Sequence, residues 1–172
     1  MNIATLVRDT VRRLIKRKEG SSTIELAIVL PILVLLFVGA TELGRLFYTY
    51  TTLAKATKVG ARYLSTSRDA TSTDATTQSN ALARAKSLVV CGVPNLDCTG
   101  QTPIVNGLTP ATNVKVTFFT QTEGTVQVQY VTVEIQSYTY QAGVFNLAAW
   151  TGNANSKFYF SLTPRTTMRY ML

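Results

Sequence analysis

One uncharged stretch constrains this chain more than any other feature. The sixteen residues from Leu26 to Thr41 carry no charge and are mostly large and apolar, and Glu25 and Glu42 bound them. Counted from Ser21, the stretch has 21 residues, which as an α-helix would span about 30 Å, the thickness of the hydrocarbon core of a bilayer. The sequence therefore predicts one membrane-spanning helix.

The charge distribution predicts the orientation of this helix. The 172 residues have a formal net charge of +8, and half of that excess lies in the first twenty residues, which hold six basic and two acidic side chains. Basic segments beside a membrane helix stay on the cytoplasmic side. We therefore expect a single-pass protein of the cytoplasmic (inner) membrane, with its N-terminus inside and its C-terminal part outside. The rest of the chain is too weakly basic for a nucleic-acid partner.

Two residues distinguish the apolar stretch from a plain anchor. An ionised, unpaired Glu25 would cost a few kcal/mol inside the membrane, and Pro31 removes a backbone hydrogen bond, which predicts a helix kink. If the chain were cut after Gly20, Ser21 would carry a new α-amine with an ordinary pKa of about 7.7 to 8. That protonated amine, four residues before Glu25, could neutralise the carboxylate.

This order of residues resembles the type IV prepilin signal, which a membrane aspartyl peptidase cuts after the glycine. Residues 20–67 also resemble the N-terminal region of TadE-like pseudopilins, the minor pilins of the Tad (tight adherence, Flp) pilus and secretion machinery. Ser21 stands where many type IV pilins have an aromatic residue. The residues that carry the family resemblance are Gly20 with Glu25, Leu30 with Pro31, Glu42 to Phe47, and Ala61 with Arg62.

The resemblance implies a structural subunit with no enzymatic activity. Gly20 and Ser21 would form the processing site, and Glu25 would pair with the new amine during assembly through the helix. The implied partners are other pilin or pseudopilin subunits, prepilin peptidase, the Tad inner-membrane assembly platform and membrane lipid. The mature chain would then enter an extracellular pilus.

An alternative reading is a secretory signal peptide. Val38-Gly39-Ala40 fits a small-x-small cleavage site after an apolar region, and a cut there would release a product that begins at Thr41. The function would then be that of a secreted binding module. An uncut helix would give a membrane-anchored one.

The helical pattern continues beyond the membrane segment. Apolar residues recur at spacings of three and four as far as Leu64, which is typical of an amphipathic helix. A helix over residues 21–64 would be about 66 Å long, so its C-terminal half must leave the membrane. We therefore expect a leader at 1–20, a long helix at 21–64 and an exported domain at 65–172.

The exported domain has the pattern of a small α+β fold. Asp74 is a candidate cap for a short helix that reaches Val90. From Asn113 the apolar period changes to two, with a hairpin turn at Glu123-Gly124 and a change of phase near Tyr130 that indicates either a bulge or a change of burial partner. A looser segment over 142–155 precedes strands at 157–162 and 166–171. We expect three or four antiparallel strands, with the long helix packed on them as in pilins.

The sequence offers little for catalysis or metal binding. It has no histidine, so the usual base for a nucleophile and the commonest zinc ligand are missing, and we expect no catalytic residue, metal or cofactor. Cys91 and Cys98 are its two cysteines. In an exported domain they predict a disulfide, and a loop of eight residues closed in this way contributes about 2.5 kcal/mol.

Overall fold

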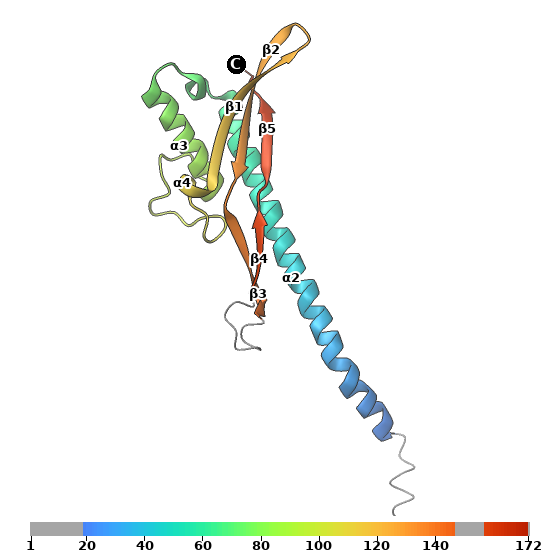
Figure 1. The fold of residues 1–172 in the computed structure, drawn as a ribbon. Helices are drawn as coiled ribbons and strands as arrows, with labels where there is room; N and C mark the ends of the chain where they lie inside the picture. The colour runs from blue at the N-terminus through green and yellow to red at the C-terminus, as the bar shows by residue number, and fades with distance from the viewer. Residues whose placement is uncertain (1–18, 147–156, 172) are drawn as a thin grey trace, which may run out of the picture. The chain divides into compact units, whose positions relative to one another are not determined.

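The computed structural model describes residues 19–146 and 157–171 (Figure 1). This part of the chain begins with one long helix, α2 (Glu19–Thr66), of 48 residues. The chain divides into two compact units, residues 1–42 and residues 43–172. Because the boundary falls inside α2, the described part of the first unit is helix alone.

The helix of the first unit has a long exposed stretch. Every side chain from Ser22 to Phe37 is exposed, and eleven of them are large and apolar, with Phe37 76% accessible. The helix from Ser22 is long and apolar enough to cross a membrane, and its most apolar 18-residue window has a mean hydropathy of 2.5. The predicted long N-terminal helix is confirmed.

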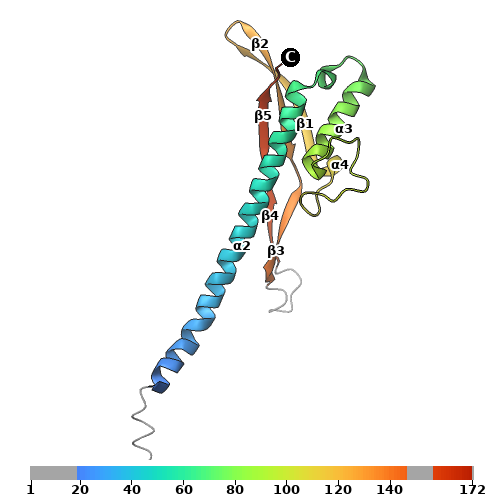
Figure 2. The ribbon, with the colours of Figure 1, turned by 180° about the vertical axis from the view of Figure 1, so that it is seen from behind.

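The core of the second unit lies between helices and strands. The C-terminal half of α2 contributes Leu53, Ala56, Ala61 and Leu64 to it, and β2 (Val126–Ile135) contributes Val131, Val133 and Ile135. A second helix, α3 (Ala75–Cys91), adds four buried apolar residues. Because these side chains form one cluster, α2 and α3 pack on the same face of the sheet (Figure 2).

A three-stranded antiparallel sheet forms the other side of this core. Its order is β1 (Val114–Glu123), β2 and β5 (Arg165–Arg169). β1 and β2 form a hairpin paired from Val114 with Ile135 to Glu123 with Val126. Gly124 in the turn has a φ of 65°, a left-handed conformation that suits glycine. The predicted hairpin is confirmed, but its turn is Gly124-Thr125 rather than Glu123-Gly124, because Glu123 still pairs with Val126.

The bulge considered near Tyr130 is wrong, because the β1–β2 register runs without a shift along the whole hairpin. The change of phase instead reflects a change of burial partner. Val131, Val133 and Ile135 belong to the core cluster, whereas Val128, on the opposite phase and only 5% exposed, lies outside it.

The prediction of an irregular segment over residues 142–155 is also wrong for its first five residues, which belong to a strand. The chain forms β3 (Tyr138–Asn146), which pairs with β4 (Lys157–Leu162) in a separate two-stranded sheet. The small residues Ala142 and Gly143 interrupt the alternation of large apolar side chains that marked the other strands. The described residues therefore form five strands where the sequence predicted three or four, and β5 ends at Arg169 rather than at 171.

Short helices complete the second unit. Asp74 caps α3 as predicted, since its carboxylate accepts hydrogen bonds from the backbone N–H groups of Thr76 and Thr77. A 3₁₀ turn, η1 (Arg68–Thr71), follows α2, and the one-turn helix α4 (Pro110–Asn113) precedes β1. The α+β fold class, a long apolar helix followed by a small antiparallel sheet, is confirmed.

Candidate functional site

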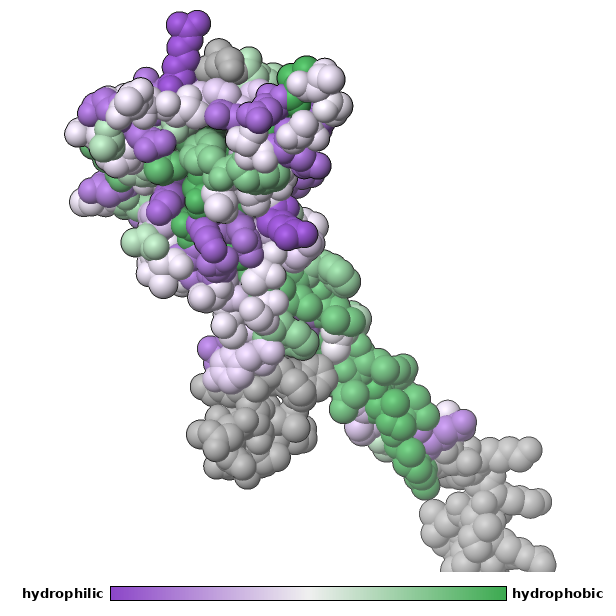
Figure 3. Space-filling view, turned by 45° about the horizontal axis from the view of Figure 1, so that its top comes forward, coloured by the Kyte–Doolittle hydropathy of each residue, from purple (hydrophilic) through white to green (hydrophobic). Residues whose placement is uncertain are grey.

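The apolar helix segment, residues 22–41 of α2, is the most distinctive surface of the first unit. Figure 3 shows hydrophobic side chains gathered along it, and Ile24, Ile28 and Phe37 are each more than 60% exposed. Soluble monomeric proteins rarely expose a continuous apolar surface of this extent. The segment therefore needs an apolar environment, which either lipid or other apolar helices can supply.

The predicted processing residues lie at the start of this helix. Gly20 and Ser21 are in its first turn, and Glu25 follows one turn later with an exposed side chain. Residues four apart lie on one helical face, so Ser21 and Glu25 share a face. Cleavage after Gly20 and pairing of the new amine with Glu25 remain predictions.

Pro31 lies inside α2, which is helical on both sides of it. Its ring leaves one carbonyl of the preceding turn without an N–H donor. The helix runs without interruption from Glu19 to Thr66. The kink at Pro31 remains a prediction.

The C-terminal half of α2 also carries apolar side chains that stay exposed. Leu43, Phe47 and Tyr50, spaced by four and three residues, are 55%, 64% and 45% exposed. Val59 is also half exposed. This stripe continues the helical period that predicted an amphipathic helix. Leu43 lies five turns before the fully buried Ala61, so the stripe runs along nearly the same side of α2 as residues that reach the core.

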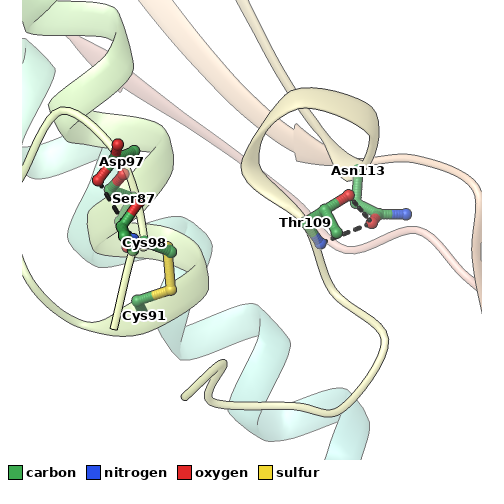
Figure 4. Close-up of a disulfide and its surroundings, with 7 residues drawn as sticks. Ser87, Cys91, Asp97, Cys98, Thr109 and Asn113 are labelled. Atoms are coloured by element: carbon green, nitrogen blue, oxygen red, sulfur yellow. Dashed lines mark hydrogen bonds between the residues drawn. A yellow bond between two sulfur atoms is a disulfide. The ribbon is translucent and has the colours of Figure 1, made fainter. Parts of the chain in front are cut away.

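The two cysteines lie together at the end of α3 (Figure 4). Cys91 is the last residue of the helix, and its sulfur is bonded to that of Cys98 at 1.98 Å. Gly92, with a φ of 74°, ends the helix by donating from its N–H to the Leu88 carbonyl. The Ile104 N–H donates to the Val90 carbonyl at 2.7 Å. The disulfide loop and the segment after it are thus both fastened to α3.

The described residues offer no cluster of ligands suitable for a metal site. They contain no group of three or more His, Cys, Asp and Glu side chains arranged to hold a metal. Asp97, in the disulfide loop, accepts a hydrogen bond from the Thr99 N–H at 3.2 Å. An open groove of about 320 Å³ has one charged lining residue, Lys55. The groove is lined by Thr52, Lys55, Ala56, Val59, Leu88, Gly92 and Ile104.

Asn113 is a structural residue that the sequence reasoning missed. It is 6% exposed, and its side-chain oxygen accepts from the N–H and the hydroxyl of Thr109 at 2.8 and 3.1 Å (Figure 4). Its amide nitrogen donates to the carbonyls of Gln136 and Ser137. Asn113 therefore joins the start of β1 to the segment after β2. The sequence signal was Thr109 before Pro110, a pattern typical of a helix start.

A second missed contact attaches the end of the chain to the end of α2. The Tyr170 hydroxyl donates to the Ser67 carbonyl at 2.5 Å and lies 3.0 Å from the Thr71 hydroxyl. The Met171 N–H donates to the Ser65 carbonyl at 3.0 Å. The apolar periodicity of the sequence does not predict these hydrogen bonds, because they join polar groups that are far apart in the sequence.

Comparison with known proteins gives a family match that lies within the long helix α2. Residues 20–62 match the family model described as TadE-like protein. No curated protein and no solved structure matches the chain at a significant level. The matched quarter of the chain begins at Gly20 and contains the whole apolar helix segment. The N-terminal helix of this chain is therefore similar to the TadE-like family over residues 20–62, and the match supports a role as a minor pilin associated with the Tad pilus.

Proposed function

We propose that this chain is a structural prepilin that is cut after Gly20 and assembled through α2 into a Tad-type pilus. One observation carries the proposal: the TadE-like match starts at Gly20 and coincides with an exposed apolar helix that is long enough to cross a membrane. The family is structural, which supports a non-enzymatic role.

Insertion in the membrane comes first in this mechanism. The six basic residues before Gly20 hold the leader on the cytoplasmic side. The apolar helix segment then lies in lipid, and the second unit is exported. Prepilin peptidase reaches the bond after Gly20 from the cytoplasmic side, because the basic leader keeps that bond at the membrane surface.

Cleavage changes the electrostatics of the helix end. The new amine of Ser21 is cationic at neutral pH, and Glu25 lies on the same helical face one turn away. Neutralising the carboxylate lowers the cost of keeping it among apolar side chains. Glu25 therefore sets the register of the mature helix within the assembly.

The exposed stripe of Leu43, Phe47 and Tyr50 extends the assembly surface beyond the membrane. The later turns of α2 pack on its own sheet, and the stripe would pack on helices of neighbouring subunits. The subunit would thus be held by the helix while the sheet unit forms the outer surface of the pilus.

The first test identifies the N-terminus of the envelope-associated protein by mass spectrometry. The proposal expects Ser21, and a bulky Gly20→Leu variant should leave the chain uncut. A product that begins at Met1 would contradict processing. A soluble product that begins at Thr41 would instead favour a secreted binding module.

The second test separates assembly from processing. Glu25→Ala should still be exported and cut but should be depleted from isolated pili, whereas Glu25→Asp, which keeps the carboxylate, should retain incorporation. Normal incorporation of Glu25→Ala would refute the pairing role.

A further inference from the structure

β1 is an edge strand with a long free side. The sheet order β1-β2-β5 places β1 at one edge, where β2 pairs with only one of its sides over all ten residues. Within residues 19–146 and 157–171, no strand pairs with its other side. Such an edge presents unpaired N–H and C=O groups and can pair with a further strand.

The half of β1 near the hairpin turn is open to solvent. Every side chain from Phe119 to Glu123 is exposed, and so are Lys115 and Thr117 on the same phase. Figures 1 and 2 both show the hairpin end standing clear of α3. The ring of Phe119 stacks on Tyr130 of β2, with the ring centres 5.4 Å apart, so it is held in place on the outer face of the sheet.

The charges on this strand are symmetric about Phe119. Lys115 lies four residues before it and Glu123 four residues after it. In an antiparallel pair centred on Phe119, Lys115 of one copy stands opposite Glu123 of the other, and two-fold symmetry repeats the pair. Residues directly opposite across antiparallel strands have β-carbons about 4.5–5.5 Å apart, within reach of an ion pair. A parallel arrangement in register would place like charges opposite each other.

We propose that β1 is an interface for a second copy of this chain, with the two β1 strands pairing antiparallel about Phe119. The pairing joins two three-stranded sheets into one of six strands. The hydroxyl of Tyr130 donates to the Glu123 carboxylate, whose remaining lone pairs can accept from Lys115 of the second copy. The proposal does not depend on cleavage after Gly20 or on pilus assembly, because β1 lies wholly within the second unit.

The test uses the full chain, reconstituted in vesicles, with the photoreactive benzoylphenylalanine in place of Phe119. Irradiation should give a covalent dimer linked through the peptide that contains residue 119. Lys115→Glu alone and Glu123→Lys alone should each reduce the dimer at least fivefold. Co-reconstituting the two single variants should restore it, because the charges of one then complement those of the other. Arg84→Glu, a charge reversal at an exposed position of α3, should leave the yield unchanged.

The mixture separates loss of pairing from loss of folding. Two misfolded variants would not rescue each other, so restored dimer in the mixture supports the β1 interface. An absent crosslink in the parent chain, unchanged yield in both single variants, or no rescue in the mixture would overturn it.

Discussion

Gly60 of α2 lies so close to Val89 of α3 that a β-carbon on Gly60 would stand 2.4 Å from the Cγ2 atom of Val89. The same β-carbon would lie 3.6 Å from the Ala85 carbonyl oxygen and 3.7 Å from Val133 of β2. A glycine at this point therefore lets the two helices and the sheet meet. It also lies inside the TadE-like match, which ends at residue 62.

Replacing Gly60 by alanine should destabilise the second unit. Alanine favours a helix over glycine by about 1 kcal/mol, but Val89 is fully buried in the core and has little room to move. Overpacking of this kind costs about 1–3 kcal/mol. We expect a net loss of about 1 kcal/mol in the free energy of unfolding of the full chain in detergent micelles, measured with urea.

Gly44 provides the matched control, because it lies in the same helix and a β-carbon there would meet nothing within 4 Å. Gly44→Ala should be neutral, or stabilising by up to about 1 kcal/mol. Equal effects of the two substitutions would contradict the close approach at Gly60.

The cap of α3 should make stability depend on acid pH. The Thr77 hydroxyl, at 2.5 Å, and the backbone N–H groups of Thr77 and Thr76 hold the pKa of Asp74 below its ordinary 3.8. Above 3.8 the carboxyl is ionised in both states, so the contribution of the cap is complete. It is lost as the pH falls through the lowered pKa of the folded state. The stability gap between the wild type and Asp74→Ala should therefore narrow below 3.8 in thermal unfolding.

Asp74→Asn supplies the control for this pH dependence, because asparagine keeps a capping oxygen without an ionisable group. The difference in thermal stability between Asp74→Asn and Asp74→Ala should be the same at about pH 3 as at about pH 7. If the difference in stability between the wild type and Asp74→Ala stayed constant between about pH 3 and about pH 7, the ionised carboxylate of Asp74 would not be what stabilises the start of α3.

Local sequence patterns predicted those elements that local chemistry specifies. The apolar run predicted α2, Asp74 predicted the start of α3, and the alternation from Val114 together with Gly124 predicted the β1–β2 hairpin. Each signal lies within the element that it specifies. The resemblance over residues 20–67 came from the same local order of residues, and the match over 20–62 supports it.

Elements that depend on distant partners were missed. β3 contains Ala142 and Gly143 and is identified by its pairing with β4, across the segment 147–156. The change of apolar phase near Tyr130 fits either a bulge or an unbroken strand whose two faces are buried by different elements. The sequence cannot distinguish these two cases, because it does not show which element buries Val128. Asn113 was missed because its partners, Gln136 and Ser137, lie more than twenty residues away.

The disulfide should stabilise the second unit by restricting its unfolded chain. Cys91 and Cys98 close a loop of eight residues, for which chain entropy predicts about 2.5 kcal/mol. The double variant Cys91→Ser with Cys98→Ser should lose about that much in urea unfolding. A reductant should lower the stability of the wild type by a similar amount and leave the double variant unchanged. Equal stability of the oxidised and reduced wild type would show that the bridge does not restrict unfolding.

Asn113 should be among the most sensitive polar positions of the second unit. Asn113→Ala removes the acceptor for both Thr109 donors and the donors to Gln136 and Ser137, and it leaves those groups without that partner. An orphaned buried polar group costs about 1–3 kcal/mol, so we expect a loss of about 3 kcal/mol in urea unfolding. Thr112→Ala, at an exposed position of the same short helix, should change stability by less than about 0.5 kcal/mol. Similar losses at the two positions would show that the helical turn, rather than the Asn113 side chain, provides the stability.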